Sequence, residues 1–407
     1  MRRHDSGENA AGTAPARDVV DGDDPAPDAR SVEVMRRATA GALLAAALLL
    51  AGCGSDGYEP SGPFRPLPEG APPEVGPPPS SAPTPGRPAE PGAEEEGGDP
   101  NVVATGLAVP TGLALLPDGS AVVGERDTGR ILQVFPDRSP ARELMVVPGV
   151  DTAGDGGLLG LAVSPTFAED GLLYAYLSTA VDNRVVRFPI RGMPNAVLTG
   201  IPRGEVHNGG GLLFGADGSL FVGTGDAGNP ALATDPASLA GKVLRIDVFG
   251  GPVGPDRVFT SGHRDVTAVC AGAEDRLFAA DAARGGADEL DELVEGADYS
   301  GPAGPVVEIV PGEDGLGGCA VLGPAVFLGA LDGERVHVVP VDEGGAVSGE
   351  LEEFLGGQYG RLRTVVADAQ GALWITTSNR DGIGTPAADD DKVLRINPPS
   401  AAGGSPL

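Results

Sequence analysis

One histidine of this sequence is placed where a carboxylate can act on it. His207 lies in the segment VHNGGGLLFGADGSLFVGTGDAG, residues 206–228. The apolar runs on each side of the GADG stretch predict a β-hairpin with a four-residue turn. In that register Phe214 faces Ser219. His207 then faces Asp226, which brings the imidazole and the carboxylate within hydrogen-bonding reach.

A histidine–aspartate pair of this kind has a defined chemistry. The carboxylate fixes the tautomer of the ring and stabilises the imidazolium that forms when the ring accepts a proton. These are the properties of a general base. The alternative is that His207 is a structural histidine whose hydrogen bonds are satisfied within the fold. Asn208 and the glycines after it would let the backbone approach a flat ligand closely.

The net charge of the chain excludes one class of partner. Asp and Glu outnumber Lys and Arg by 58 to 28, which gives a formal charge of −30. A phosphate backbone would be repelled by such a surface. We therefore expect no nucleic acid partner.

The N-terminal region contains a short targeting pattern. Met35-Arg36-Arg37 precedes an apolar stretch at 38–49, and Leu50-Ala51-Gly52-Cys53 follows. This pattern resembles a bacterial lipoprotein signal with its lipobox over 35–53, which implies lipid attachment at Cys53 and an extracytoplasmic protein anchored to the membrane. The apolar stretch is short for a membrane span. The alternative, a buried apolar helix, would not account for the basic start and the cysteine.

Several segments are expected to lie outside the folded domain. Residues 1–34 precede a complete signal, so we interpret Met35 as the start and 1–34 as a non-structural extension. Residues 54–100 are rich in Pro, Gly, Ser and Glu and predict an extended, disordered tether. A short disordered tail is expected at 399–407.

The remaining two cysteines, Cys270 and Cys319, match no zinc-binding spacing. They can form a disulfide if the compartment is oxidising.

A repeat of about fifty residues organises the chain from 101 to 398. Each repeat has an apolar run with a turn signal and a later, alternating run. No window has a sustained helical period, so the domain is predicted to be all-β, and the repeat predicts a six-bladed β-propeller. A pair of β-sandwiches is the alternative, but it would not explain the period. The six turn-linked runs are LPDGSAVV (116–123), AEDGLLYAYL (168–177), FGADGSLFVG (214–223), AGAEDRLFAA (271–280), VLGPAVFLGA (321–330) and ADAQGALWIT (367–376).

The sequence supports only weaker predictions for two further histidines. His337 lies in the alternating run VHVVPV and is predicted to be a surface residue of an outer strand. His263, next to Arg264, is as consistent with loop packing as with function. The alternating run VVEIVPG from Val306 is predicted to be equivalent to the run that contains His337.

Several motifs, taken together and in order, resemble the glucose/sorbosone dehydrogenase family. The resemblance covers residues 101–398 and implies a six-bladed propeller that binds pyrroloquinoline quinone (PQQ) and calcium and oxidises an aldose sugar. The motifs are GDGGLLGLAVSP (154–165), HNGGGLLFGADGSLFVGTGDAG (207–228), SLAGKVLRID (238–247), SGHRD (261–265), DELDELVEGADYSGP (288–302) and GRLRTVVADAQGALWITTSNRDG (360–382).

The resemblance also implies roles for individual residues. His207 would take the proton of the anomeric hydroxyl while hydride passes to the quinone, and Asp226 would support it. Arg264 would stabilise the negative charge that develops on the cofactor. The positions implied for cofactor binding are Asp155, Asn208, Asp265, Arg361 and Arg363.

Two arginines of the last motif suit an anionic ligand. Arg361 and Arg363 are two residues apart on a predicted strand and so share one face. PQQ carries three carboxylates, which arginine recognises well. The alternative is a pair of solvated arginines at a blade edge.

The resemblance places calcium at Asp281, Glu289 and Tyr299, where carboxylate and carbonyl oxygens are plentiful. The alternative is a solvated acidic loop.

Two functions remain open from the sequence. The first is a lipid-tethered, PQQ-dependent sugar dehydrogenase, with the sugar and the electron acceptor undetermined. The second is a sugar- or protein-binding propeller that has lost the quinone site. Loops 265–267 and 281–287 depart from the family pattern and support the second. Asp265 and Thr267, for example, stand where the family has Asn and Gln.

Overall fold

A computed structural model describes residues 98–282, 286–301, 303–342, 344 and 346–398. The predicted signal, the lipidation site Cys53, the tether before residue 98 and the tail from 399 lie outside the described residues. Within the part of the chain that is described, no helix has the length and apolar character needed to cross a bilayer.

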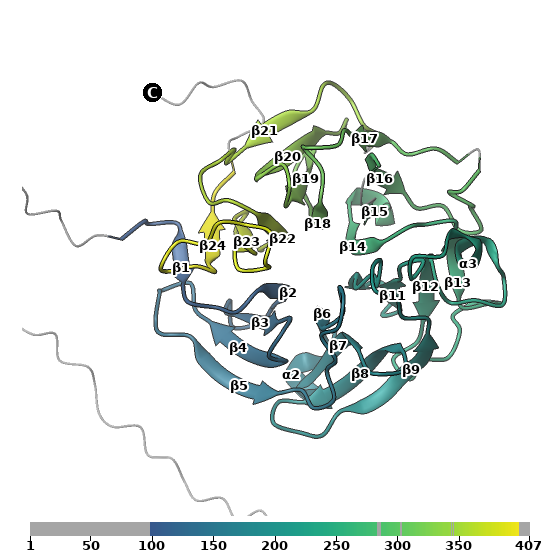
Figure 1. Ribbon diagram of the computed structural model, residues 1–407, viewed down its shortest axis with the longest axis horizontal. Helices are drawn as coiled ribbons and strands as arrows, with labels where there is room; N and C mark the ends of the chain where they lie inside the picture. Colours follow the sequence, from purple (N-terminus) through teal and green to yellow (C-terminus); the bar gives the residue numbers. More distant parts are fainter. Residues whose placement is uncertain (1–97, 283–285, 302, 343, 345, 399–407) are drawn as a thin grey trace, which may run out of the picture. The chain divides into compact units, whose positions relative to one another are not determined.

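Six four-stranded antiparallel sheets form the blades of a β-propeller, as the repeat predicts. Figure 1 shows the sheets in a ring, with β2, β6, β14, β18 and β22 nearest the centre. From the innermost to the outermost strand, the first three blades are β2 (Pro110–Leu115), β3 (Ala121–Glu125), β4 (Arg130–Val134), β5 (Arg142–Val146); β6 (Leu158–Val163), β7 (Leu172–Ser178), β8 (Asn183–Pro189), β9 (Asn195–Ile201); and β10 (Leu212–Phe214), β11 (Leu220–Gly223), β12 (Lys242–Ile246), β13 (Val258–Ser261).

The last three blades repeat the pattern. In the same order they are β14 (Val266–Ala271), β15 (Leu277–Asp281), β16 (Asp288–Glu292), β17 (Val307–Ile309); β18 (Leu316–Leu322), β19 (Ala325–Ala330), β20 (Arg335–Pro340), β21 (Glu352–Phe354); and β22 (Leu362–Ala367), β23 (Leu373–Thr377), β24 (Val393–Ile396), β1 (Val102–Ala104). All these strands lie inside the predicted boundaries of 101–398.

The ring closes between the two ends of the domain. β1 pairs with β24, so the first strand in the sequence completes the last blade (Figure 1). Asp391, which is fully buried, reinforces this closure. Its carboxylate accepts hydrogen bonds from the backbone N–H groups of Asn379 at 2.6 Å and Val109 at 3.2 Å, and therefore links the last blade to the first.

The hydrophobic core is divided into six clusters, one between each pair of neighbouring blades. Leu158 and Leu173 of the second blade, for example, pack with Ile131 of the first. Each interior sheet face is covered by the next blade. This explains why many strands are apolar throughout instead of alternating. The residues of β3 and of β23 are all buried.

The predicted hairpin register is wrong by one residue. Phe214 pairs with Leu220, not with Ser219, because Gly215 and Ser219 close the turn by a hydrogen bond from the Gly215 N–H to the Ser219 carbonyl at 2.8 Å. The segment is nevertheless the innermost hairpin of the third blade, as predicted. The ladder ends before residue 207, so register alone does not bring His207 to its carboxylate.

Two predictions about outer strands are also wrong. His337 is fully buried on β20, and its Nε2 lies 2.7 Å from the Glu313 carbonyl; it is not a surface residue. The run from Val306 contains β17, the fourth strand of its blade, whereas the third strand is the acidic β16. The sequence DELDE of β16 has little of the composition expected for a strand.

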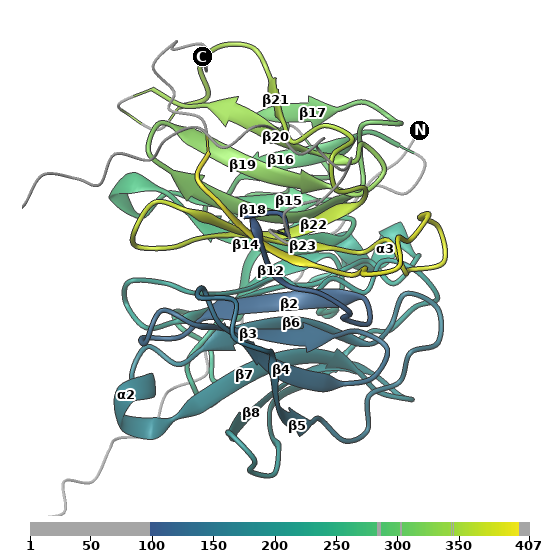
Figure 2. The same cartoon turned by 90° about the vertical axis from the view of Figure 1, so that its left-hand side faces the viewer.

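The two ends of the propeller carry different connections. The short helix α3 (Pro230–Thr234) and the loop after β23 lie at one end, and α2 (Phe167–Asp170) lies at the other (Figure 2). The end with α3 also carries the loops that lead into each innermost strand. We call it the loop end.

A disulfide joins two neighbouring blades. Cys270 on β14 and Cys319 on β18 are bonded, with their Cα atoms 5.8 Å apart and a sequence separation of 49. Both strands are innermost, so the bond links blades four and five next to the central channel.

We predict that removal of this disulfide destabilises the domain, because the cross-link restricts the unfolded chain. For a loop of this length the loss is roughly 4 kcal/mol in the free energy of unfolding. The Cys270→Ala, Cys319→Ala double variant should unfold at lower urea concentration than the wild type, and reductant should shift only the wild type. An unchanged midpoint after complete reduction of the wild type, checked by thiol titration, would contradict the prediction.

Candidate functional site

A cavity of about 250 Å³ opens at the loop end and is lined by loops from several blades. His207 and Asn208 enter it from the loop before β10, and Asp265 from the loop before β14. Arg361 and Arg363 enter it from the start of the last blade. The structure thus brings together predicted residues that are far apart in sequence. Asp155 also lines this cavity.

The backbone at His207 is held in an uncommon conformation. Its φ of 57° is in the left-handed region, where a residue with a side chain is strained. Gly209 follows with a φ of 73°. A Cβ at Gly225 would overlap the His207 carbonyl oxygen, so a glycine is required there. These conformations turn His207 out of the strand direction and toward Asp226.

His207 and Asp226 form the predicted pair. The Nδ1 of His207 lies 2.8 Å from Oδ1 of Asp226, which is almost fully buried. Asp226 also accepts the Gly228 N–H at 2.7 Å, so the carboxylate is fixed. Because an ionised carboxylate can only accept, Nδ1 carries the proton and Nε2 presents a lone pair. Nε2 has no hydrogen-bond partner among the residues that the structure describes.

The surroundings favour the protonated form of His207. The hydrogen bond to Asp226 raises the pKa of His207, burial opposes this, and the charge of Asp265 adds to the increase. Arg264 lowers the same pKa. A raised pKa makes the ring a stronger proton acceptor, which suits a general base.

Asn208 has a positioning role. Its side-chain oxygen accepts hydrogen bonds from the Gly204 N–H and from Asn183 Nδ2, both at 3.0 Å, and its own Nδ2 donates to the Gly204 carbonyl. The buried Tyr176 hydroxyl donates to the Asn208 carbonyl at 2.7 Å. The amide is therefore used within the protein, and it holds the loop that carries His207.

The two arginines of the last blade differ in their partners. Arg361 is 6% exposed, and its guanidinium pairs with Asp332 at 2.5 Å and with Asp381 at 2.8 Å. Arg363 forms no hydrogen bond or ion pair with any described residue, although it is partly buried in the cavity wall. Burial and the neighbouring Arg126 lower the pKa of Arg363 to about 10. The alternative of two solvated arginines is therefore wrong.

Arg264 lines a second cavity, of about 320 Å³, and does not line the cavity of His207. Asp226, Asp281, Glu289 and Tyr299 also line this second cavity. Arg264 acts on His207 through its charge, as the effect on the histidine pKa shows. The side chain of Arg264 makes no hydrogen bond or ion pair within the described part of the chain.

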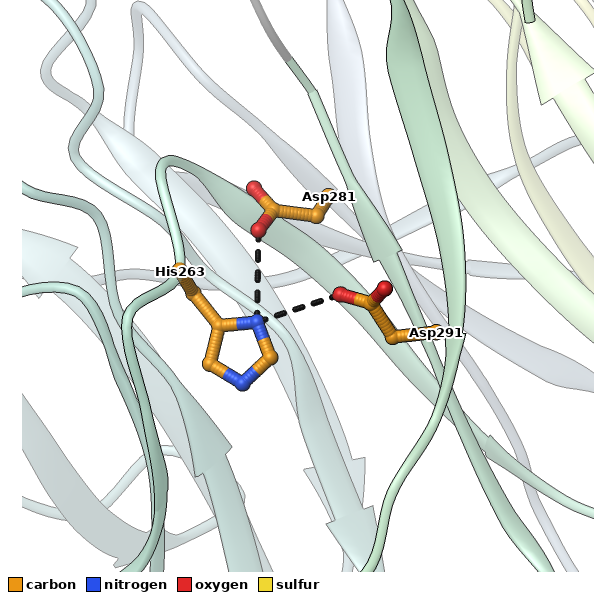
Figure 3. A group of neighbouring side chains, drawn as sticks. All are labelled: His263, Asp281 and Asp291. Atoms are coloured by element: carbon orange, nitrogen blue, oxygen red, sulfur yellow. Dashed lines mark hydrogen bonds and ion pairs between the residues drawn. The ribbon is translucent and has the colours of Figure 1, made fainter. Parts of the chain in front are cut away.

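His263, which precedes Arg264 in sequence, forms a buried ionic cluster with Asp281 and Asp291 (Figure 3). Nδ1 of His263 is 3.2 Å from Asp281 and 3.3 Å from Asp291. Although burial opposes a charge, the two carboxylates raise the pKa of His263 to about 9. Thr260 Oγ1 lies 2.8 Å from the other ring nitrogen, so an imidazolium has a partner at both nitrogens, while the carboxylate oxygens of Asp291 are buried without a hydrogen bond from the described residues.

The predicted calcium ligands do not fit a calcium shell. Asp281 accepts the backbone N–H groups of Arg264 and Asp265, in addition to contacting His263, and so anchors the loop. Burial, together with Asp291 and Asp281, raises the pKa of Glu289 to about 7. Calcium requires six to eight oxygen ligands. We therefore assign Asp281 to the loop and derive no step through calcium.

Sequence reasoning missed several acidic residues of the cavity wall. Asp314, Asp332 and Asp381 line it, and two of them hold Arg361 in place. Asp381 lies in the motif at 360–382 but was given no role there, and Asp314 and Asp332 lie in no motif, because isolated aspartates in loops are common. A useful signal would have been their positions, each shortly before or after a predicted inner strand.

The fold and the cavity define a six-bladed β-propeller with a small-molecule site at the loop end. The sequence pattern of the family Glucose / Sorbosone dehydrogenase matches residues 107–306. The solved PQQ-bound form of aldose sugar dehydrogenase from Streptomyces coelicolor is 38% identical; the match covers 73% of this chain and 96% of that one, with a TM-score of 0.70. The chain belongs to the glucose/sorbosone dehydrogenase family.

More distant relatives agree on the fold. The soluble aldose sugar dehydrogenase of Escherichia coli, solved in its apo-form, is 20% identical, with 73% of this chain and 99% of that one covered and a TM-score of 0.65. Quinoprotein glucose dehydrogenase B of Acinetobacter calcoaceticus is 26% identical over 49% of this chain. The match spans 52% of that relative, so the chain spans about half the length of this curated protein.

We predict that Asp226→Asn lowers the pKa of His207, because the Asp226 hydrogen bond is the largest contribution that raises it. The histidine ring signals can be titrated by NMR in the protein without ligand, with His207→Gln identifying the signal. Asp217→Asn is a matched control in the turn of the same hairpin, where Asp217 pairs with Arg245. Equal titration of His207 in the wild type and in Asp226→Asn would refute the assignment.

Proposed function

We propose that this protein oxidises an aldose sugar at its anomeric carbon with PQQ as the cofactor. The observation that carries the proposal is the open Nε2 of His207 in the same cavity as Arg363, a guanidinium without a partner among the described residues. A proton acceptor in the same cavity as an unneutralised cation suits an anionic cofactor and a hydroxyl substrate.

The residues of the cavity are compatible with PQQ. An unpaired, partly buried guanidinium is costly in the free protein, and a carboxylate ligand would relieve this cost. Arg363 would hold one carboxylate of the cofactor, while Arg361, held by two aspartates, would contribute charge from a fixed position. Gly209 adds a backbone surface without a side chain next to His207.

His207 would carry out the proton transfer. PQQ, when bound, supplies the hydride acceptor. His207 Nε2 would accept the proton of the anomeric hydroxyl, and the resulting imidazolium would be stabilised by Asp226 through Nδ1. Arg264 would add positive charge from the adjoining cavity, and its loop is held by Asp281. The sugar and the electron acceptor are left open.

A second candidate function is a sugar- or protein-binding propeller without a quinone. The charge of the cavity wall favours it, since the described lining includes six aspartates and three arginines. A PQQ site with three carboxylates to accommodate would be expected to have the opposite balance. Arg361 pairs with two of these aspartates and offsets one negative charge, while Arg363 remains without a partner among the described residues, which keeps the enzyme as our first proposal.

The proposal includes an extracytoplasmic location with a lipid anchor at Cys53. The lipobox pattern at 50–53 supports it, as does the Cys270–Cys319 disulfide, because such bonds persist in oxidising compartments. The mature N-terminus, determined by mass spectrometry after expression in a bacterium, tests it. A mature chain that retains residues before Cys53 would contradict it.

We predict that His207→Ala lowers kcat for sugar oxidation by at least about a hundredfold, the usual loss when a general base is removed. The purified protein is supplied with PQQ, and the sugar-dependent reduction of an artificial electron acceptor is measured. In the wild type the rate should fall as pH decreases through the raised pKa of His207, because protonation removes the acceptor lone pair. In Asp226→Asn this fall should move to lower pH.

PQQ binding separates the two candidate functions. PQQ binding with sugar oxidation supports the dehydrogenase, provided that His207→Ala still binds the cofactor. If the wild type binds no PQQ, the dehydrogenase proposal fails and the binding propeller is favoured.

We predict opposite effects for the two arginines. Arg363→Gln should weaken PQQ binding roughly ten- to hundredfold, as expected for one lost charged hydrogen bond, and should not lower the urea midpoint of the free protein. Arg361→Gln should lower the free energy of unfolding by roughly 3 kcal/mol, because the buried carboxylate of Asp381 loses its partner. Equal effects of the two substitutions on binding and on stability would refute this division of roles.

A further inference from the structure

The ionic cluster of His263, Asp281 and Asp291 lies outside the cavity of His207, and the proposed reaction does not use it as a unit. His263 comes from the loop after β13, Asp281 from the end of β15 and Asp291 from β16. One ring nitrogen and two carboxylate oxygens meet there, all within 4.8 Å of one another (Figure 3). All three residues are buried, and Asp291 is 0% exposed.

A proton on His263 does not satisfy both carboxylates. Nδ1 carries at most one N–H, whereas Asp281 Oδ2 at 3.2 Å and Asp291 Oδ2 at 3.3 Å both face it (Figure 3). Asp281 has other donors, the backbone N–H groups of Arg264 and Asp265. Both oxygens of Asp291 are buried and accept no hydrogen bond from the described residues. A fully buried carboxylate without a hydrogen-bond donor therefore points into the cluster.

The charge of the cluster is also unbalanced. Two carboxylates and one imidazolium leave a net negative charge, which is costly in a buried position. Among the described residues, no Lys or Arg side chain pairs with Asp281 or Asp291. A divalent cation with two carboxylates and a neutral imidazole would leave no net charge.

The donor atoms suit zinc. Zinc binds imidazole nitrogen and carboxylate oxygen at about 2.0 to 2.2 Å in a tetrahedral arrangement, which places neighbouring ligand atoms about 3.4 Å apart. The two separations from Nδ1 are close to this value. Calcium, in contrast, takes six to eight oxygen ligands. The cluster therefore differs from the calcium positions that the resemblance implies, with which it shares only Asp281.

The ring of His263 is oriented for metal binding. Its Nε2 lies 2.8 Å from the buried Thr260 Oγ1, and a proton on Nε2 that donates to this oxygen leaves the lone pair of Nδ1 facing the carboxylates. The ring of Tyr299 stacks on the imidazole, with centroids 4.7 Å apart. Such outer contacts fix the tautomer and orientation of metal-ligating histidines. His263 and Asp281 also line the cavity of about 320 Å³, which gives an ion and a water ligand access.

We propose that His263 Nδ1, Asp281 Oδ2 and Asp291 Oδ2 bind one divalent transition-metal ion, which the donor set identifies as zinc. The ion supplies Asp291 with the partner that a single N–H cannot provide. It also braces the loop that carries Arg264, because Asp281 accepts the backbone N–H of Arg264. The site does not depend on the proposed quinone or sugar.

The test is zinc binding by the purified full chain, without PQQ or sugar. The protein is freed of metal with a chelator and titrated with zinc by calorimetry, and bound zinc is counted by elemental mass spectrometry. Asp291→Asn should bind one ion fewer per chain, or bind it more than about a hundredfold more weakly, since loss of an outer contact alone costs roughly ten- to hundredfold. Glu289→Gln is the matched control, because Glu289 also lies on β16 and lines the same cavity as Asp281. It should bind zinc as the wild type does.

Equal zinc binding by the wild type and Asp291→Asn would overturn the proposal. Loss of zinc in Glu289→Gln alone would also overturn it, because the ion would then occupy the positions that the resemblance implies. The urea midpoints of the metal-free proteins show whether Asp291→Asn is folded.

A second measurement needs no variant. Cobalt(II) added to the metal-free wild type should give the intense visible absorption of a four-coordinate ion, and zinc should displace it. Absence of this absorption, with both ring N–H groups of His263 still present by NMR at saturating zinc, would show that a proton occupies the cluster and would overturn the proposal.

Discussion

Closure of the ring is the constraint on which the rest of this structure depends. Each blade is a twisted four-stranded sheet, and its apolar faces are buried only by the blades on either side. An open arrangement would leave two of these faces in water. The pairing of β1 with β24 removes those ends, and Asp391 adds a buried carboxylate that holds the first and last blades together. A strand from the start of the domain is therefore as important for the last blade as its own strands.

The closed ring allows the loop end to carry features that would be costly elsewhere. His207 has a strained backbone, Arg363 lacks a partner among the described residues, and Asp265 is a carboxyl in an acidic environment. Each is attached to an innermost strand or to a loop next to one, and the core clusters between blades hold these strands in place. Stability is supplied by the sheets, so the loops are free to hold groups whose charges are only balanced when a ligand is bound.

Much of the fold could be predicted from the repeat, and less of the site. The six turn-linked runs indicated six blades because each blade uses the same hairpin. β16 was not recognised, because its sequence DELDE is stabilised by tertiary contacts; Asp288 accepts backbone N–H groups of Gly315 and Leu316, and Asp291 faces His263. His337 was misplaced because a buried polar residue on a strand has the same alternation as an exposed one. Its burial depends on the Glu313 carbonyl, which no local pattern shows.

The sequence by itself determined the all-β class and the number of blades, since these follow from short-range patterns of apolar residues, turns and glycines. It also predicted the pair of His207 and Asp226, but from a hairpin register that the structure corrects. The geometry of that pair was decided by the tertiary structure, because the register is shifted and the left-handed conformation at His207, packed against Gly225, turns the ring toward the carboxylate. Only the folded ring also separated Arg361, which two aspartates hold, from Arg363, which has no partner among the described residues. Residues of distant blades come together only when the ring closes. The sequence alone therefore does not show which charged side chains pair with one another.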